Sequence, residues 1–246
     1  KYLPKGYKNL YALKTPYETY AEYEAAMRYN KKYADFTPEV LKNIRELDQT
    51  LPVMQGKIMN FTEADQQKGN PHFSDPDAAT EGYFINCQTC TMTYELRRRG
   101  FPVEALPNKN DEFYKVWCPK NNLTWNDRFL NPDGSRPIKT RPSVLRDTIT
   151  AKVGFIEGAT KETGRYELYL KWKSVRGRDG GAHVMIVERQ KDGNLLWFDP
   201  QSGKHGSSKT FNGFMKSAVP VKLSVLRIDD KIINPKFSER FKKASK

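Results

Sequence analysis

The feature that most constrains the fold of this chain is a series of strand patterns in its C-terminal half. These patterns, rich in β-branched and aromatic residues, occupy residues 165–173, 182–188, 194–199 and 221–228. A turn containing Asp192-Gly193 separates the second pattern from the third, and Asp-Gly between two strands is typical of a tight β-hairpin. We therefore expect an antiparallel sheet in which the second and third patterns pair with each other.

Helix patterns dominate the N-terminal part of the chain instead. Residues 17–34 carry tyrosines and other large side chains at helical spacing. Residues 38–49 begin at Thr37-Pro38, a favourable N-cap followed by a proline suited to the first helical turn. We expect these two helices to form an N-terminal helical arm, residues 1–54, ahead of a larger domain, residues 55–246.

A third helix is predicted from Asn86 to Arg99. Gly100 follows its basic last turn, at the position where a left-handed C-cap would lie. Residues 101–106 then alternate like a short strand, and residues 119–143, rich in Pro, Asn and Gly, are expected to be a surface insertion. Helices followed by antiparallel strands predict an α+β fold in which a helix packs against a curved sheet.

Composition supports a folded chain without a membrane span. Apolar residues make up only 37% of the 246 residues, but aromatic residues at 12% and the absence of repeats argue against wholesale disorder. Mean hydropathy is -0.78, and there is no apolar run of about 18 residues, so we expect a soluble protein. The chain begins at Lys1 with no signal-peptide pattern, and we expect it to be part of a longer protein.

Basic residues outnumber acidic ones along the whole chain. With 42 Lys and Arg against 29 Asp and Glu, the formal net charge is +13, which suits a polyanion or an acidic protein partner. Small basic clusters lie at residues 97–99, 171–178 and 236–246, but no recognisable nucleic-acid-binding module accompanies them. We therefore expect a mainly solvated basic surface, with weak nucleic-acid contact as the alternative.

The cysteine content indicates a reducing compartment. Cys87, Cys90 and Cys118 do not make a disulfide framework, because their number is odd and the first two are too close together to staple distant elements. A zinc site is the alternative, with these three thiols and a fourth ligand from one of the histidines, His72, His183 or His205. Structural zinc sites usually present a second ligand pair at short spacing, which this chain lacks, so we expect no metal.

Two thiols at the start of the predicted third helix are the main chemical signal. The unsatisfied amides and the dipole of a helix N-terminus favour negative charge and so stabilise a thiolate, the nucleophilic form of cysteine. Cys87 lies at this end, and Cys90 lies one turn further along a similar face. We favour Cys87 as the nucleophile and keep Cys90 as the alternative.

A cysteine nucleophile also needs a base, and the base needs an orienting group. His183 lies at the start of a predicted strand, just after Gly180-Gly181, and the partner strand ends at Asp199. Counting outwards from the hairpin turn places His183 opposite roughly position 202, close to Asp199. Gln201 adds an amide that could bond the imidazole or an oxyanion. A lone histidine at a strand start is more often structural, so only the combination points to catalysis.

Two blocks of the sequence, in this order, resemble the papain-fold toxin domains found at the C-termini of bacterial polymorphic toxins and in phage head proteins. Residues 83–105 are similar to the Asn-Cys-x-x-Cys helix of that family, with its Arg-Gly turn and short strand. Residues 181–184 and 196–203 resemble its Gly-His strand and its Asp-Pro-Gln strand end. The resemblance spans about residues 55–230, and Ala182 departs from it, because many members have Gly directly before the histidine.

The resemblance implies a papain-like α+β fold and a cysteine amidohydrolase that acts on a protein substrate, by glutamine deamidation or by peptide cleavage. It implies Cys87 as nucleophile, His183 as general base, Asp199 as orienting residue and Gln201 as a weaker helper, with no cofactor. Such a toxin or effector would act in the reducing cytoplasm of a target or host cell, delivered as the C-terminal part of a larger toxin or virion protein. An immunity or inhibitor protein could be its partner.

The alternative function is a non-catalytic virion domain with a papain-like fold that binds DNA or a capsid protein. The net charge of +13 and the occurrence of the family in phage heads motivate this hypothesis. Binding to phosphates falls steeply with salt, so a salt titration of DNA binding would distinguish the two functions.

Overall fold

A computed structural model of the chain describes residues 36–51, 58–65, 69–108 and 124–244. These residues belong to one compact unit, which begins at Phe36. Within these ranges, no helix is long and apolar enough to cross a membrane. The helix predicted at residues 17–34 and the third cysteine, Cys118, lie outside the described residues.

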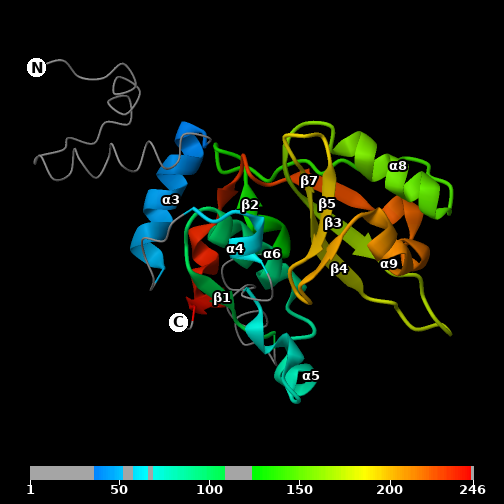
Figure 1. Ribbon diagram of the computed structural model, residues 1–246, viewed down its shortest axis with the longest axis horizontal. Helices are drawn as coiled ribbons and strands as arrows, with labels where there is room; N and C mark the ends of the chain where they lie inside the picture. Colours follow the sequence, from blue (N-terminus) through cyan, green and yellow to red (C-terminus); the bar gives the residue numbers. More distant parts are fainter. Residues whose placement is uncertain (1–35, 52–57, 66–68, 109–123, 245–246) are drawn as a thin grey trace, which may run out of the picture. The chain divides into compact units, whose positions relative to one another are not determined.

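The described chain has mixed helices and strands, which confirms the predicted α+β class (Figure 1). The α-helices are α3 (Pro38–Thr50), α4 (Phe61–Ala64), α5 (Ala78–Glu81), α6 (Cys87–Arg98), α8 (Ile149–Ala159) and α9 (Asn212–Ser217). The strands are β1 (Val103–Ala105), β2 (Phe129–Leu130), β3 (Gly164–Lys171), β4 (Ala182–Arg189), β5 (Leu195–Asp199), β6 (Lys204–Gly206), β7 (Ser224–Arg227), β8 (Ile232–Ile233) and β9 (Phe241–Lys243). Short 3₁₀ helices are η1 (Pro71–Ser74), η3 (Trp125–Asp127), η4 (Ser208–Phe211), η5 (Pro220–Lys222) and η6 (Pro235–Arg240).

An antiparallel five-stranded sheet, in the order β6-β5-β4-β3-β7, is the framework of the unit. The predicted hairpin joins β4 to β5, with Gly193 at φ 84° and the Asp192 carboxylate accepting from the Asn194 N–H at 2.9 Å. Ile186 lies opposite Phe198, a register within one position of the predicted one. The hairpin therefore brings the start of β4 close to the end of β5.

The two faces of this sheet are covered by different helices. One face packs against α8 and α9 and forms an apolar core, which includes Leu168, Met185 and Trp197. α6 packs against β4 on the other face. Figure 1 shows α8 and α9 on one side of the sheet and α6 on the other. The helix that begins at Cys87 therefore lies along the strand that begins next to His183.

α3 belongs to the same compact unit as the sheet, so the boundary expected at residue 54 does not separate it from the rest. Thr37 caps the helix as predicted, with its hydroxyl accepting from the Val40 N–H at 3.4 Å. The buried Asn43 side chain donates to the Ile233 carbonyl and accepts from the Ile233 N–H, both at 2.8 Å. These long-range bonds explain why α3 packs on the body rather than forming an arm.

The run Arg97–Arg99 is not part of the solvated basic surface that we expected. Arg99 is fully buried and pairs with Glu95 at 2.8 Å. Arg97 is also buried, and its Nε donates to the Ala64 carbonyl at 3.0 Å. The prediction was wrong here because these guanidinium groups bond acceptors inside the unit, which a count of charges along the chain does not reveal.

Part of the segment expected to be a surface insertion, residues 119–143, is built into the body. β2 pairs with β8, and Phe129 is only 2% exposed. Arg128 is buried and bonds the buried carboxylate of Glu167. The expectation was wrong for residues 125–130, because pairing with a distant strand outweighs their loop-like composition.

Candidate active site

Cys87 is the first residue of α6, and the residue before it leaves the helix start open. Asn86 occupies the N-cap position, but its side chain makes no capping hydrogen bond. The first amide groups of a helix have no intrahelical acceptor, so without a cap they can donate to a group in front of the helix. The Cys87 thiol is a free thiol and is partly exposed at this point.

The Asn86 side chain instead joins three segments behind the thiol. Its Oδ1 accepts from Cys90 Sγ and from Gln201 Nε2, each at 3.2 Å. Its Nδ2 donates to Asn70 Oδ1 at 3.1 Å, and Asn70 Nδ2 donates to the Gln201 carbonyl at 2.8 Å. All three amide side chains are buried. This amide network fixes the start of α6 against the chain that follows β5.

Cys90, the alternative nucleophile, lies in the interior. It is fully buried, and its thiol donates to Asn86. Burial raises the pKa of the Cys90 thiol well above 9.0, and the nearby Cys87 and Asp199 raise it further. Because the thiolate is the reactive form, a buried neutral thiol is inert. Of the two thiols, only Cys87 is placed for chemistry.

His183 lies between the thiol and a carboxylate. Its Nε2 is 3.1 Å from Asp199 Oδ1, and the Cys87 thiol lies near enough to the ring to raise the pKa of the imidazole. Since Nε2 faces Asp199, Nδ1 is the ring nitrogen available to the thiol. The structure therefore brings Cys87, His183 and Asp199 together in the order thiol, imidazole and carboxylate.

The contacts of His183 determine its charge. Burial acts to lower the pKa of the imidazole, but the hydrogen bonds to Asp199 and Cys87 outweigh burial and raise the pKa from 6.5 to about 10. The ring is consequently an imidazolium at neutral pH.

Aromatic rings enclose the imidazole. The Trp172 ring stacks on His183 at 6.1 Å and 17°, and Phe214 meets it edge-on at 5.5 Å and 89°. Gly180 allows this arrangement, because a Cβ there would lie 2.3 Å from the Lys173 carbonyl oxygen and 2.8 Å from the Trp172 Cβ. The enclosure leaves His183 only 8% exposed, which strengthens its bond to Asp199.

Asp199 is held by the chain that follows it. Its Oδ1 accepts from the Gln201 N–H at 3.2 Å, and its Oδ2 accepts from the Ser202 hydroxyl at 2.6 Å. Gln201, expected as a helper through its side chain, supports Asp199 through its backbone, while its side chain bonds Asn86. Gln201 is therefore a positioning residue in this geometry.

The sequence analysis missed the roles of Asn70, Asn86 and Trp172. Asn86 had a local signal, because an asparagine directly before Cys87 occupies the N-cap position. Asn70 lies in a segment rich in Gly, Pro and Asp that carries no helix or strand pattern, and Trp172 continues a strand pattern. Their roles depend on contacts between segments that are distant in the sequence.

The candidate zinc ligands do not form a cluster in the described chain. No group of three or more His, Cys, Asp or Glu side chains there could hold a metal ion. His72 bonds Asp75 at 2.8 Å, and His205 bonds the Gly203 carbonyl at 3.2 Å. The zinc alternative therefore has no support in the ranges that the structure describes.

Comparisons with protein-family models, curated proteins and solved structures find no match to this chain. The resemblance to papain-fold toxin domains consequently stays a prediction from the sequence. The chemistry of the site rests on the contacts among Cys87, His183 and Asp199 themselves.

Proposed function

We propose that this protein is a papain-like cysteine amidohydrolase that attacks an amide bond of a protein substrate. The observation that carries the proposal is the contact series from Cys87 to His183 to Asp199. A partly exposed thiol at a helix start meets an imidazole that is oriented by a buried carboxylate. These are the partners that a nucleophile, a base and an orienting group require.

In the proposed reaction, the Cys87 thiolate adds to the carbonyl carbon of the amide and forms a tetrahedral oxyanion. The uncapped first amides of α6 donate hydrogen bonds to this oxyanion. The protonated His183 then gives its Nδ1 proton to the departing nitrogen. The C–N bond breaks, and a thioester remains on Cys87.

Water completes the cycle. The neutral His183 removes a proton from water, the hydroxide adds to the thioester carbonyl, and the C–S bond breaks to return the thiolate. If the first leaving group is ammonia, a glutamine side chain becomes glutamate; if it is a peptide amine, the substrate is cleaved. Both reactions pass through the same acyl-enzyme. We therefore propose that the substrate is an amide, and experiment decides between deamidation and cleavage.

Asp199 and Gln201 act through the imidazole in this scheme. Asp199 bonds Nε2 and keeps Nδ1 directed at the thiol. The Gln201 N–H and the Ser202 hydroxyl in turn hold the carboxylate in position. Loss of either support is expected to lower the rate by misdirecting the ring rather than by removing a reacting group.

The setting that we propose follows from the free thiol. Cys87 must stay reduced to react, which fits the reducing cytoplasm of a target or host cell. Delivery as the C-terminal part of a larger toxin or virion protein, and control by an immunity or inhibitor protein, are proposals that extend the resemblance.

A thiol-reactive probe tests the nucleophile. Fluorescent iodoacetamide is applied at about pH 6, where an ordinary cysteine of pKa near 8.5 is mostly protonated. In a Cys118→Ser background, we expect labelling of the parent and of Cys90→Ala and loss of labelling in Cys87→Ala. Labelling that persists without Cys87 contradicts the proposal.

Mass spectrometry identifies the product. Lysates of candidate target cells are incubated with the active protein or with Cys87→Ala as control. Conversion of glutamine to glutamate in the active sample alone indicates deamidation, and new chain ends indicate cleavage. The absence of both from every target cell type, with a thiol that still reacts, would count against an amidohydrolase.

A non-catalytic basic domain that binds DNA or a capsid protein is the second candidate function, favoured by the net charge of +13. Lys173, Arg176 and Arg178 are exposed between β3 and β4 and could contact phosphates. DNA affinity that falls steeply with salt would support this function. We prefer the enzyme, because DNA binding does not require the buried contact of His183 with Asp199.

A further inference from the structure

A cavity of about 460 Å³ lies at the start of α6, beside the residue that follows Cys87. Gln88 follows Cys87 at the start of α6, and Val184 follows His183 in β4; Gln88 and Val184 both line the cavity. Its position beside the start of α6, which carries the Cys87 thiol, makes it the natural place for the part of a substrate next to the attacked amide.

A row of side chains across three strands forms one wall of this cavity. Tyr169 of β3 lies opposite Val184 of β4 and opposite Ser224 of β7, and all three line the cavity. Residues opposite each other in a sheet project from the same face, and Val184 shares its face with Glu188, which bonds Arg98 of α6. The row therefore lies on the face that α6 covers. A polypeptide lying along the row would extend from β7 towards β4, the strand that α6 contacts.

The charged residues that line the cavity are all basic. They are Arg128, Lys139, Arg141 and Lys222. No Asp or Glu lines the cavity within the described ranges. The carboxylate of Glu167 bonds Arg128 and Lys139 from a buried position and neutralises only part of this charge.

Arg141 and Lys222 carry the positive charge of the cavity that Glu167 does not neutralise. Both side chains are exposed, and no carboxylate contacts either of them in the part of the chain that the structure describes. Cations that lie close together at a concave surface raise the local concentration of anionic ligands. The cavity is therefore suited to a ligand with negative charge.

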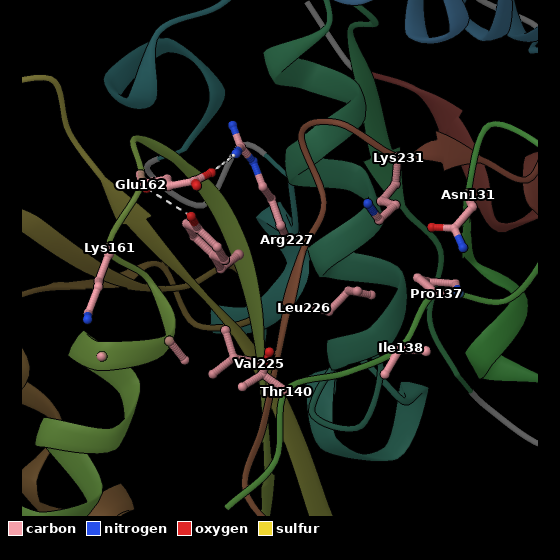
Figure 2. A pocket seen from close by; sticks show the side chains of 13 residues that line it. Asn131, Pro137, Ile138, Thr140, Lys161, Glu162, Val225, Leu226, Arg227 and Lys231 are labelled. Carbon is pink, nitrogen blue, oxygen red and sulfur yellow. Dashed lines mark hydrogen bonds and ion pairs between the residues drawn. The ribbon is translucent and has the colours of Figure 1, made fainter.

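A second cavity, of about 400 Å³ beside the edge strand β7, gives a contrast (Figure 2). Arg227 lines it and donates to Glu162 at 2.8 Å and to Asp229 at 2.9 Å. Glu162 lines the same cavity, and no cysteine or histidine does so in the described chain. A positive group here already has acidic partners, whereas Arg141 and Lys222 have none.

We propose that the first cavity, which we call the basic cleft, binds an acidic segment of the protein substrate beside the amide that Cys87 attacks. The inference rests on the proposed function, because that reaction requires a polypeptide next to the thiol. Glu or Asp side chains of the substrate pair with Arg141 and Lys222, and because both cations are exposed, this attraction is strongest at low salt. Acidic sequence around the attacked amide is thus a determinant of which proteins are modified.

Peptide binding to the inactive Cys87→Ala variant tests the basic cleft. The probes are two fluorescein-labelled peptides of the same length, one with Glu at alternate positions and one with Gln there, followed by fluorescence anisotropy at low salt. We expect the Glu peptide to bind about tenfold more tightly than the Gln peptide. Adding Arg141→Glu and Lys222→Glu should remove this preference.

The matched control carries Lys161→Glu and Lys191→Glu in the same Cys87→Ala protein. Both lysines are exposed and lie outside the basic cleft, so the net charge changes equally while the cleft stays intact. We expect this control to keep the preference for the Glu peptide. Equal binding of the two peptides, or an equal loss in both double variants, overturns the inference.

Labelling of Cys87 separates failure of the cleft from failure of the proposed function. Normal labelling of the parent without preference for the Glu peptide overturns the basic cleft alone. Absent labelling of the parent overturns the proposed function, whichever peptide binds. A DNA oligonucleotide that binds through Arg141 and Lys222 while the Glu peptide does not bind overturns the acidic segment in favour of a nucleic acid.

Discussion

The two faces of the central sheet hold their helices by different forces. On the face covered by α8 and α9, the side chains of the sheet pack in an apolar core, and Leu168 and Met215 are fully buried there. On the face covered by α6, charged side chains are buried as well. Glu95 of α6 is fully buried and accepts from Arg99 at 2.8 Å and from Arg165 at 2.6 Å. The first face supplies a hydrophobic core, and the second supplies directional bonds.

The buried ion pairs on the α6 face explain how the thiol is positioned. Apolar packing has little preference for one register, whereas an ion pair exists only when its two groups meet. Glu95 joins α6 to Arg165 of β3, and Arg98 joins α6 to Glu188 of β4. A slip of α6 by one residue would break both pairs, so they set where Cys87 meets the strand that carries the imidazole.

Removing the buried carboxylate of Glu95 should cause the largest loss of stability on the α6 face. In Glu95→Ala, the buried guanidinium groups of Arg99 and Arg165 lose their acidic partner, and uncompensated buried charge is strongly destabilising. We expect the free energy of unfolding in urea to fall by about 3–5 kcal/mol. In the control Glu162→Ala, which removes a partner of the half-exposed Arg227, we expect a loss below about 1 kcal/mol. Similar losses in the two variants would contradict the special role of the α6 face.

Low pH should lower the stability that the ion pairs of Glu95 contribute on the α6 face. Burial alone would raise the pKa of Glu95, but Arg165 and Arg99 lower it from 4.5 to about 2. A depressed folded-state pKa contributes stability that is complete above about pH 4.5 and is lost as the pH falls towards about 2. We expect on the order of 3 kcal/mol to be lost in urea unfolding over this window. Glu95→Gln lacks this titration, so a wild-type profile identical to that of the variant would refute the assignment.

Conservative substitutions should cost more stability on the face covered by α6 than on the face covered by α8 and α9. Arg99→Lys replaces a planar group that bonds Glu95 and the carbonyls of Ile228 and Lys231 with a single ammonium, at a cost of about 2 kcal/mol. Met215→Leu on the apolar face keeps the side-chain volume and should cost less than about 1.5 kcal/mol. Chemical denaturation of both variants measures the difference. A larger loss of stability in Met215→Leu than in Arg99→Lys would contradict the view that directional bonds hold α6 more specifically than apolar packing holds α8 and α9.

Local signals made much of the fold predictable. Asp192-Gly193 identified the hairpin, and Gly100, at φ 102°, marked the end of α6. α8 was missed because its sequence contains two glycines and no clear apolar stripe. Its buried Lys152 donates to the carbonyls of Met215 and Ala218 at 2.7 and 2.6 Å, and no local pattern predicts such long-range bonds.

The candidate site was predictable only in part, for the same reason. A helix start, a strand start and a strand end identified Cys87, His183 and Asp199, because the register of one hairpin links the last two. The basic cleft was not predictable, since Arg128 meets the sheet through its bond to Glu167, in a segment that resembled a loop. Composition alone therefore gave the net charge but not its location.

A smaller loss of stability than that of the Glu95 and Arg99 variants tests whether the amide network positions the thiol. Asn70→Ala removes the bonds to Asn86 and to the Gln201 carbonyl and should cost about 1 kcal/mol in urea unfolding. Because the network holds the start of α6, the rate of Cys87 alkylation should fall as well, and its pH profile should shift if the contact with His183 is displaced. The control Asn212→Ala, at an exposed position of α9, should change neither quantity. If Asn70→Ala lowers stability while the rate and the pH profile stay unchanged, the network supports the fold and the ion pairs of α6 alone place the thiol.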